Sequence, residues 1–193
     1  MLTKLSVNQV TAAKLVNLVK WWEDYTLRNK GSMDNNPSPG NKKGGLTTIL
    51  EKSLGASVKG GNTPLMGVYK YADLVKASGF VFMDSPGYDP ASVTGQIAGG
   101  CNLVCFTTGR GSAFGSKPAP TIKLATNTEM YSRMKDDMDV NCGDILDGHH
   151  SVEEKGRQIY EMILKVASGE KSKSELQGLG DYEFVPWQIG AVM

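Results

Sequence analysis

Three short apolar runs, separated by segments with helical spacing, most constrain how this chain can fold. The runs are Phe80–Met83, Leu103–Phe106 and Thr121–Ala125, each flanked by turn residues. Continuous apolar runs of this length are typical of strands buried on both faces of a sheet. Helical patterns at Pro90–Ala98 and Glu129–Asp137 alternate with them. The chain is therefore predicted to be an α/β protein, a Rossmann-like three-layer domain with one small, mainly parallel sheet that holds all three runs.

Further helices are predicted at Val7–Arg28, Leu46–Ser53, Tyr71–Ser78 and Ser151–Val166. The last of these opens on a capping box, in which a serine is followed three residues later by a glutamate. Gly31–Gly45 is rich in Asn, Pro and Gly, so we predict no regular structure there. The alternation of predicted strands and helices predicts a parallel sheet that is covered on both faces.

Charge and hydropathy exclude two classes of partner. The net charge is +1 and the pI is about 7.6. This balance gives no sign of the broad basic surface that binds nucleic acid or an anionic membrane. No apolar run approaches the roughly 20 residues that span a bilayer, and the N-terminus lacks the pattern of a signal peptide. We expect a cytoplasmic protein, whose Cys101, Cys105 and Cys142 are interpreted as buried, reduced thiols rather than metal ligands.

Polar and glycine-rich segments follow each predicted strand. They are Asp84–Gly87, Thr107–Gly111 and Thr126–Asn127. Ligands of open α/β sheets bind outside the carboxyl ends of the strands, so these segments predict a site at one sheet edge. Arg110 offers a planar fork that fits a carboxylate, beside threonine hydroxyls and backbone N–H donors. The alternative is a surface turn whose arginine is only hydrated.

Two other features have competing interpretations. Prolines and glycines in Asn35–Gly45 can hold polar side chains in a fixed array that binds hydroxyls and a carboxylate, or they form a rigid connection between domains. Lys123 lies among apolar neighbours in a predicted strand, so it faces either a polar cleft or solvent, with solvent favoured.

A polar cluster follows later in the chain. Asp139, Asn141 and Asp144 could bind a hard cation through oxygen ligands, although a helix-capping loop is the favoured interpretation. His149 and His150 are interpreted as an exposed loop, since no carboxylate or cysteine lies at a compelling metal spacing.

Three motifs resemble, in order, the C-terminal domain of the altronate/galactarate dehydratase family. They are Asn36–Gly45, Phe106–Gly111 and Lys123–Asn127, and the resemblance extends from about Asp24 to Gly169. The Lys42–Lys43 pair and Met138–Asn141 are more similar to galactarate than to altronate enzymes. The large subunit of sulfolactate sulfo-lyase belongs to the same family.

The resemblance implies a metal-dependent hydro-lyase that dehydrates a sugar acid. It implies a divalent metal, often iron, with ligands largely outside this chain. Family members also carry an N-terminal SAF-type domain and a middle domain. We therefore expect residues 1–30 to be a helical connection from the middle domain, residues 31–193 to be the C-terminal domain, and the chain alone to be inactive. A homo-oligomer is possible, and a non-catalytic binding or assembly module is the alternative function.

The resemblance also gives the candidate substrate-binding residues, all of them polar and all within the three motifs. They are Asn36, Ser38, Asn41, Lys42, Thr107, Thr108, Arg110, Lys123 and Asn127. Removing a proton next to a carboxylate and expelling a β-hydroxyl also needs a general base. The sequence does not identify this base.

Overall fold

The computed structural model describes residues 1–33, 36–43 and 45–190, which fold into two compact units. The first unit comprises Met1–Lys70 and Val75–Asp84, and the second comprises Tyr71–Leu74 and Ser85–Met193. The expected division between residues 1–30 and 31–193 concerns the domains of a longer protein, so it stays a prediction.

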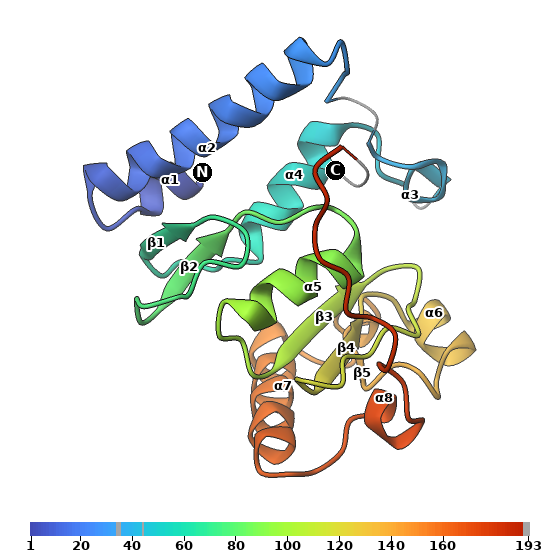
Figure 1. Cartoon of the computed structure of the whole chain (residues 1–193). Helices are drawn as coiled ribbons and strands as arrows, with labels where there is room; N and C mark the ends of the chain where they lie inside the picture. The colour runs from blue at the N-terminus through green and yellow to red at the C-terminus, as the bar shows by residue number, and fades with distance from the viewer. Residues whose placement is uncertain (34–35, 44, 191–193) are drawn as a thin grey trace. The chain divides into compact units, whose positions relative to one another are not determined.

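The first unit contains the long helix α2 (Gln9–Arg28), preceded by the short α1 (Leu2–Leu5) (Figure 1). Helix α2 begins two residues later than the predicted Val7, because the Asn8 side chain caps it by accepting a hydrogen bond from the Thr11 backbone N–H at 2.9 Å. One helical turn, α3 (Pro39–Lys43), lies inside the segment predicted to be irregular.

Helix α4 (Ile49–Val58) begins and ends later than the predicted Leu46–Ser53. The Thr48 hydroxyl accepts from the Glu51 backbone N–H, and this cap fixes the start of the helix. The residues before Thr48 therefore stay outside the helix.

The strands of the first unit correct two predictions. Strand β2 (Phe80–Met83) pairs in parallel with β1 (Leu65–Tyr69), a strand that the sequence analysis did not find. The predicted helix at Tyr71–Ser78 does not form. Ala72 has a left-handed backbone (φ 62°), and two backbone N–H groups of this segment donate to the Tyr69 hydroxyl, which removes them from any helical ladder.

The second unit holds a three-stranded parallel sheet in the order β3-β4-β5. Its strands are β3 (Val104–Thr108), β4 (Thr121–Ala125) and β5 (Val140–Asn141). The parallel pairing of the second and third predicted strands is confirmed. The prediction of a single sheet is wrong, because β2 finds its partner in β1 and belongs to a separate two-stranded sheet.

Helices cover both faces of the β3-β4-β5 sheet (Figure 1). Val93 of α5 (Asp89–Ala98) packs with Val104 of β3. Helix α7 (Val152–Ala167) packs on Ile122 and Leu124, which point to the opposite face because side chains alternate along a strand. This arrangement confirms the predicted small α/β fold with helices around a parallel sheet.

The remaining helical segments of the second unit are short. They are α6 (Thr128–Arg133), the 3₁₀ turn η1 (Gly143–Ile145) and α8 (Lys173–Leu176). The capping box predicted for α7 is confirmed: Ser151 and Glu154 each bond the other's backbone N–H.

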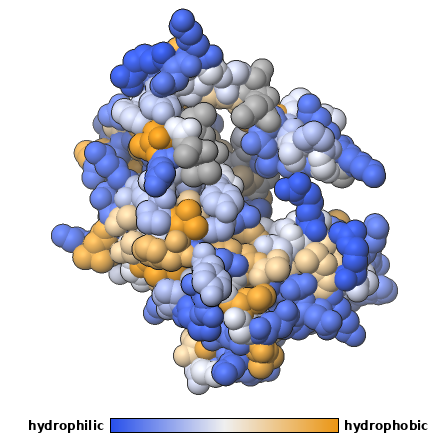
Figure 2. Space-filling model, turned by 45° about the vertical axis from the view of Figure 1, so that its right-hand side comes forward, coloured by the Kyte–Doolittle hydropathy of each residue, from blue (hydrophilic) through white to orange (hydrophobic). Residues whose placement is uncertain are grey.

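Hydrophilic residues cover much of the surface seen in Figure 2, with hydrophobic residues between them. The exposed apolar side chains include Leu27, Leu146 and Phe184. Exposed apolar side chains are ordinary on the surface of globular proteins. No helix in the described part of the chain is long and apolar enough to cross a membrane.

Candidate functional site at the carboxyl edge of the β3-β4-β5 sheet

The loops that follow β3, β4 and β5 meet at one edge of the sheet, because all three strands run in parallel. Two hydrogen bonds join the first two loops: the Thr126 backbone N–H donates to the Thr108 carbonyl at 3.0 Å, and the Asn127 amide donates to the Gly109 carbonyl at 2.9 Å. The prediction that these two segments share an edge is therefore confirmed. Asp84–Gly87 follows β2, which lies in the other sheet, so it does not belong to this edge.

The loop after β3 has a defined turn. The Thr108 hydroxyl accepts from the Gly111 backbone N–H at 3.1 Å, and Gly111 has φ +92°, a conformation that favours glycine. The turn leaves Arg110 exposed, and Thr107 is half-buried in the strand before it. The backbone thus presents the guanidinium on the surface beside the sheet edge.

Arg110 has an electrostatic partner but no ion pair among the described side chains. Burial raises the pKa of the Asp89 carboxyl at the start of α5, and the positive charge of Arg110 opposes that rise. The guanidinium donors therefore remain available to an external anion such as a carboxylate.

Asn127 holds the loops rather than facing an open site. Its side-chain oxygen accepts from the Met130 backbone N–H at 2.8 Å and caps α6, while its amide nitrogen donates to Gly109. Both ends of the side chain are engaged inside the protein. Asn127 is therefore placed to fix the position of the loop that carries Arg110.

Lys123 is completely buried, with 0% of its surface exposed, so the favoured interpretation of a solvent-facing lysine is wrong. Its ammonium nitrogen has no hydrogen-bond partner among the residues that the structure describes. Burial lowers the pKa of Lys123, and the carboxyl groups of Asp137, Asp139 and Glu183 act in the opposite direction. A buried amine without a partner is costly, which is typical of groups kept for a function.

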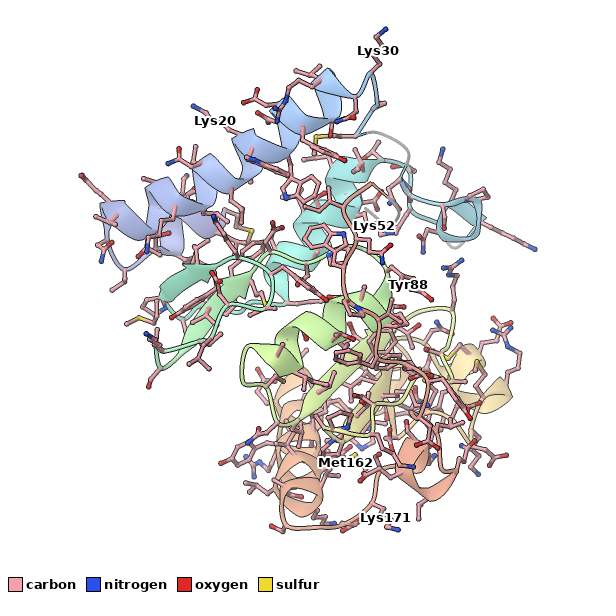
Figure 3. The ribbon with its side chains drawn as sticks, viewed as in Figure 1. Lys20, Lys30, Lys52, Tyr88, Met162 and Lys171 are labelled. Carbon is pink, nitrogen blue, oxygen red and sulfur yellow. The ribbon has the colours of Figure 1, made fainter. Side chains whose placement is uncertain are left out.

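Asn36, Ser38, Asn41 and Lys42 lie in the first unit. A residue that the sequence analysis missed organises them: the Lys52 ammonium, labelled in Figure 3, donates to the side-chain oxygens of Asn36 at 2.8 Å and Asn41 at 3.1 Å. Ser38 also donates to the Asn41 oxygen, at 3.0 Å. Lys52 lies outside the motif, three residues into α4, so only its charge could have indicated it.

The array predicted for this loop is thus partly supported. The Asn36 and Asn41 side chains are held in place, and Lys42 is exposed. Asn35 and Gly44, which belonged to the predicted segment, lie outside the described residues.

A polar cavity of about 480 Å³ lies between the end of β5 and helix α7. It brings together Asp144, His150 and Lys155. The Lys155 ammonium lies 2.7 Å from Asp144 Oδ2, and His150 Nδ1 lies 3.1 Å from the same oxygen. The interpretation of both histidines as exposed is wrong for His150, which is half-buried against this carboxylate, and right for His149.

The other residues of the predicted acidic cluster have structural partners. Both Asp139 oxygens accept backbone N–H groups, from Lys123 at 2.7 Å and from Lys173 at 2.9 Å. The Asn141 oxygen accepts from the Gly143 backbone N–H at 2.9 Å. Asp139 thus joins the backbone of β4 to that of α8, and Asn141 binds the first residue of η1, so the favoured interpretation of a helix-capping loop is supported only in part.

Neither the acidic cluster nor the cysteines form a metal site. Within residues 1–33, 36–43 and 45–190, no three His, Cys, Asp or Glu side chains are placed to hold a metal ion. All three cysteines are free thiols, but Cys105 is exposed and the other two are only half-buried, which corrects the prediction of buried thiols. The described residues therefore do not by themselves fit the expected divalent metal.

Comparison with known proteins gives consistent relatives. The chain is 38% identical over 171 residues to galactarate dehydratase (L-threo-forming) of Escherichia coli, covering 89% of this chain and 33% of the relative. It is 36% identical over 169 residues to altronate dehydratase of Bacillus subtilis, covering 88% of this chain and 34% of the relative. The (2R)-sulfolactate sulfo-lyase subunit beta of Chromohalobacter salexigens is 36% identical to the chain over 153 residues. This alignment covers 79% of this chain and 39% of the relative.

This chain therefore spans only about a third of the length of these relatives. The family model for the C-terminal part of D-galactarate/altronate dehydratase matches residues 1–192. The chain accordingly belongs to the D-galactarate/altronate dehydratase family, whose C-terminal domain it represents.

Proposed function

We propose that this chain is the C-terminal portion of a hydro-lyase that dehydrates a sugar acid of the galactarate or altronate type. The observation that carries the proposal is the carboxyl edge of the β3-β4-β5 sheet in a chain of this family. Hydrogen-bonded loops at this edge present Arg110, which has no ion pair among the described side chains. Ligand sites of parallel sheets form at this edge.

Dehydration removes the proton next to a carboxylate and expels a β-hydroxyl group. Negative charge develops on the carboxylate as the carbon loses its proton, so cationic donors at this position stabilise the transition state. Arg110 binds the substrate carboxylate through two parallel N–H···O bonds in this proposal. Thr107 and Thr108 add hydroxyl donors beside it.

Lys123 and Asn127 contribute in different ways. Lys123 brings a buried amine into the same sheet, and it binds substrate only when an approach to that amine opens. Asn127 binds indirectly, because its own hydrogen bonds fix the Arg110 loop. A separate proposal concerns the first unit, where Asn36, Ser38, Asn41 and Lys42 offer side chains that bind hydroxyl groups.

The longer enzyme supplies what this chain lacks. Its SAF-type and middle domains hold most ligands of a divalent metal, for which iron is expected, and no step above depends on that metal. A cytoplasmic location and assembly into a homo-oligomer stay predictions. Sulfolactate is the second candidate substrate, favoured by the sulfo-lyase relative, which aligns over 79% of this chain.

Substrate assays on the full-length protein test the proposal. Galactarate, altronate and sulfolactate are each supplied with Fe²⁺, Mg²⁺ or Mn²⁺, and formation of the keto acid or release of sulfite is followed. We expect dehydration of one sugar acid. Sulfite release alone would make the protein a sulfo-lyase, and inactivity on all three substrates with every metal would favour a binding or assembly module.

A further inference from the structure

We propose that His150 transfers protons in the dehydration reaction, with Asp144 and Lys155 as positioning residues. This inference rests on the proposed function and supplies the acid–base group that the sequence did not identify. It also extends the site along the carboxyl edge, since Asp144 lies in η1, directly after β5.

The orientation of the imidazole supports this role. Nδ1 is shielded from solvent and lies 3.1 Å from Asp144 Oδ2, although 36% of the His150 side chain is exposed. The exposed part of the ring is therefore the side away from Asp144, which carries Nε2. A histidine whose Nδ1 faces a carboxylate has its Nε2 available for proton transfer.

A second contact fixes the carboxylate itself. The Lys155 side chain is almost fully buried, with 4% of the residue exposed, and its ammonium donates to Asp144 Oδ2 at 2.7 Å and to Gln158 Oε1 at 2.8 Å. Lys155 lies in the first turns of α7, which the capping box at Ser151 anchors. The chain from Gln158 through Lys155 to Asp144 gives the imidazole a rigid support, as acid–base residues require.

The cavity beside His150 is polar and large enough for a small molecule. Its volume of about 480 Å³ lies in the range of small-molecule sites. Lys165 also lines it, together with Glu161 and Glu170, and forms no ion pair with any side chain that the structure describes. Asn141 connects the cavity to the Arg110 side of the edge, since it donates to Thr128, the residue after Asn127.

The proton transfers balance without another reagent. Nε2 accepts the proton from the carbon next to the carboxylate, the electrons of that C–H bond form the C=C bond, and the C–O bond to the β-hydroxyl breaks. The imidazolium then returns the proton to the departing hydroxide. One water and one unsaturated acid are formed, and the imidazole is neutral again.

His150→Ala in the full-length protein tests the inference, with His149→Ala as the matched control. The control changes the neighbouring histidine, which is exposed. We expect kcat of His150→Ala to fall about 100- to 10,000-fold, the usual contribution of a general acid–base group, while His149→Ala stays within about twofold of the wild type. Added imidazole should restore part of the activity of His150→Ala only, an effect that a purely structural residue does not show.

His150→Gln keeps the polar character of the site and guards against a folding defect. An equal loss of kcat in this variant, with an unchanged melting temperature, supports proton transfer. Wild-type activity in His150→Gln, or a loss that imidazole does not restore in a folded His150→Ala protein, would overturn the inference. If the wild-type protein itself dehydrates no sugar acid, it is the proposed function that fails.

Discussion

Replacing Lys123 with methionine is expected to stabilise the protein, although lysine is the native residue. Lys123 is fully buried in β4, and its ammonium has no hydrogen-bond partner among the described residues. Methionine has a similar length and no polar group, so it can occupy the same space without the cost of burying an amine. The variant therefore removes the cost of burying the ammonium group and leaves the packing of β4 nearly intact.

The size of the effect follows from the burial. A buried donor without a partner costs about 1–3 kcal/mol, and more if it is charged. The carboxyl groups of Asp137, Asp139 and Glu183 offset part of this cost. We expect a gain of about 1–3 kcal/mol in the free energy of unfolding, which for a chain of this length raises the melting temperature by about 2–4 °C per kcal/mol.

The gain should depend on pH. Burial lowers the pKa of Lys123 in the folded state below its unfolded value of about 10.4. The unfolded chain then binds the proton more tightly, so the stability of the wild type rises with pH between the lowered folded pKa and about 10.4. The advantage of the methionine variant is therefore largest at neutral pH and shrinks as the pH approaches 10.

Urea unfolding of the 193-residue chain at pH 7 and at pH 9.5, followed by circular dichroism, measures both effects. Lys171→Met is the control, because Lys171 is an exposed residue between α7 and α8 (Figure 3), and it should change stability by less than about 0.5 kcal/mol. A loss of stability in Lys123→Met, or a gain that does not shrink at higher pH, would refute the argument that the buried amine is costly. If Lys123 also binds substrate, the same variant loses kcat/KM in the full-length protein.

Two further predictions concern the carboxyl edge and the extent of the catalytic apparatus. Asn127→Ala should lower the free energy of unfolding by about 1–2 kcal/mol, because it removes the cap of α6 and the hydrogen bond to Gly109. Asn127→Asp keeps the cap and should lower this free energy less. Equal losses of stability in the two variants would contradict the capping role. The isolated 193-residue chain should show no turnover of any aldaric or aldonic acid in a coupled keto-acid assay, and robust turnover would place the whole catalytic apparatus within it.

Local sequence signals predicted several elements of this structure. The capping box of α7 predicted its start because side chain and backbone interact only three residues apart. The mainly apolar runs at Leu103–Phe106 and Thr121–Ala125 predicted β3 and β4, because short runs of this kind between turn residues are typical of strands covered on both faces. Their parallel pairing then predicted which loops share an edge.

Long-range contacts explain the errors. The partner of β2 is β1, whose Gly67 interrupts the apolar run, so the second sheet was not predicted. Periodicity at Tyr71–Ser78 indicated a helix, but the Tyr69 hydroxyl binds two of its backbone N–H groups. No local sequence pattern shows that a lysine in a strand is buried by distant segments of the chain, as Lys123 is.

Local sequence signals also indicated part of the candidate site and missed the rest. Arg110 and the loops around it follow from strand ends, which the sequence reveals. His150 does not, because it faces Asp144 in a 3₁₀ turn six residues earlier, and that carboxylate is held by Lys155 of helix α7, five residues after His150. Only the folded chain brings these three residues together.

The most direct measurement of the central claim is kcat/KM for Arg110→Lys in the full-length protein on its preferred acid, together with its melting temperature. Lysine keeps the positive charge and loses the two-point geometry that fits a carboxylate. Losing one charge-assisted contact of this kind costs about 1.5–3 kcal/mol, so kcat/KM should fall roughly ten- to hundredfold. Stability should change by less than about 0.5 kcal/mol, because Arg110 is exposed. Unchanged kinetics, or a collapse of stability along with activity, would contradict the assignment of Arg110 to the substrate carboxylate.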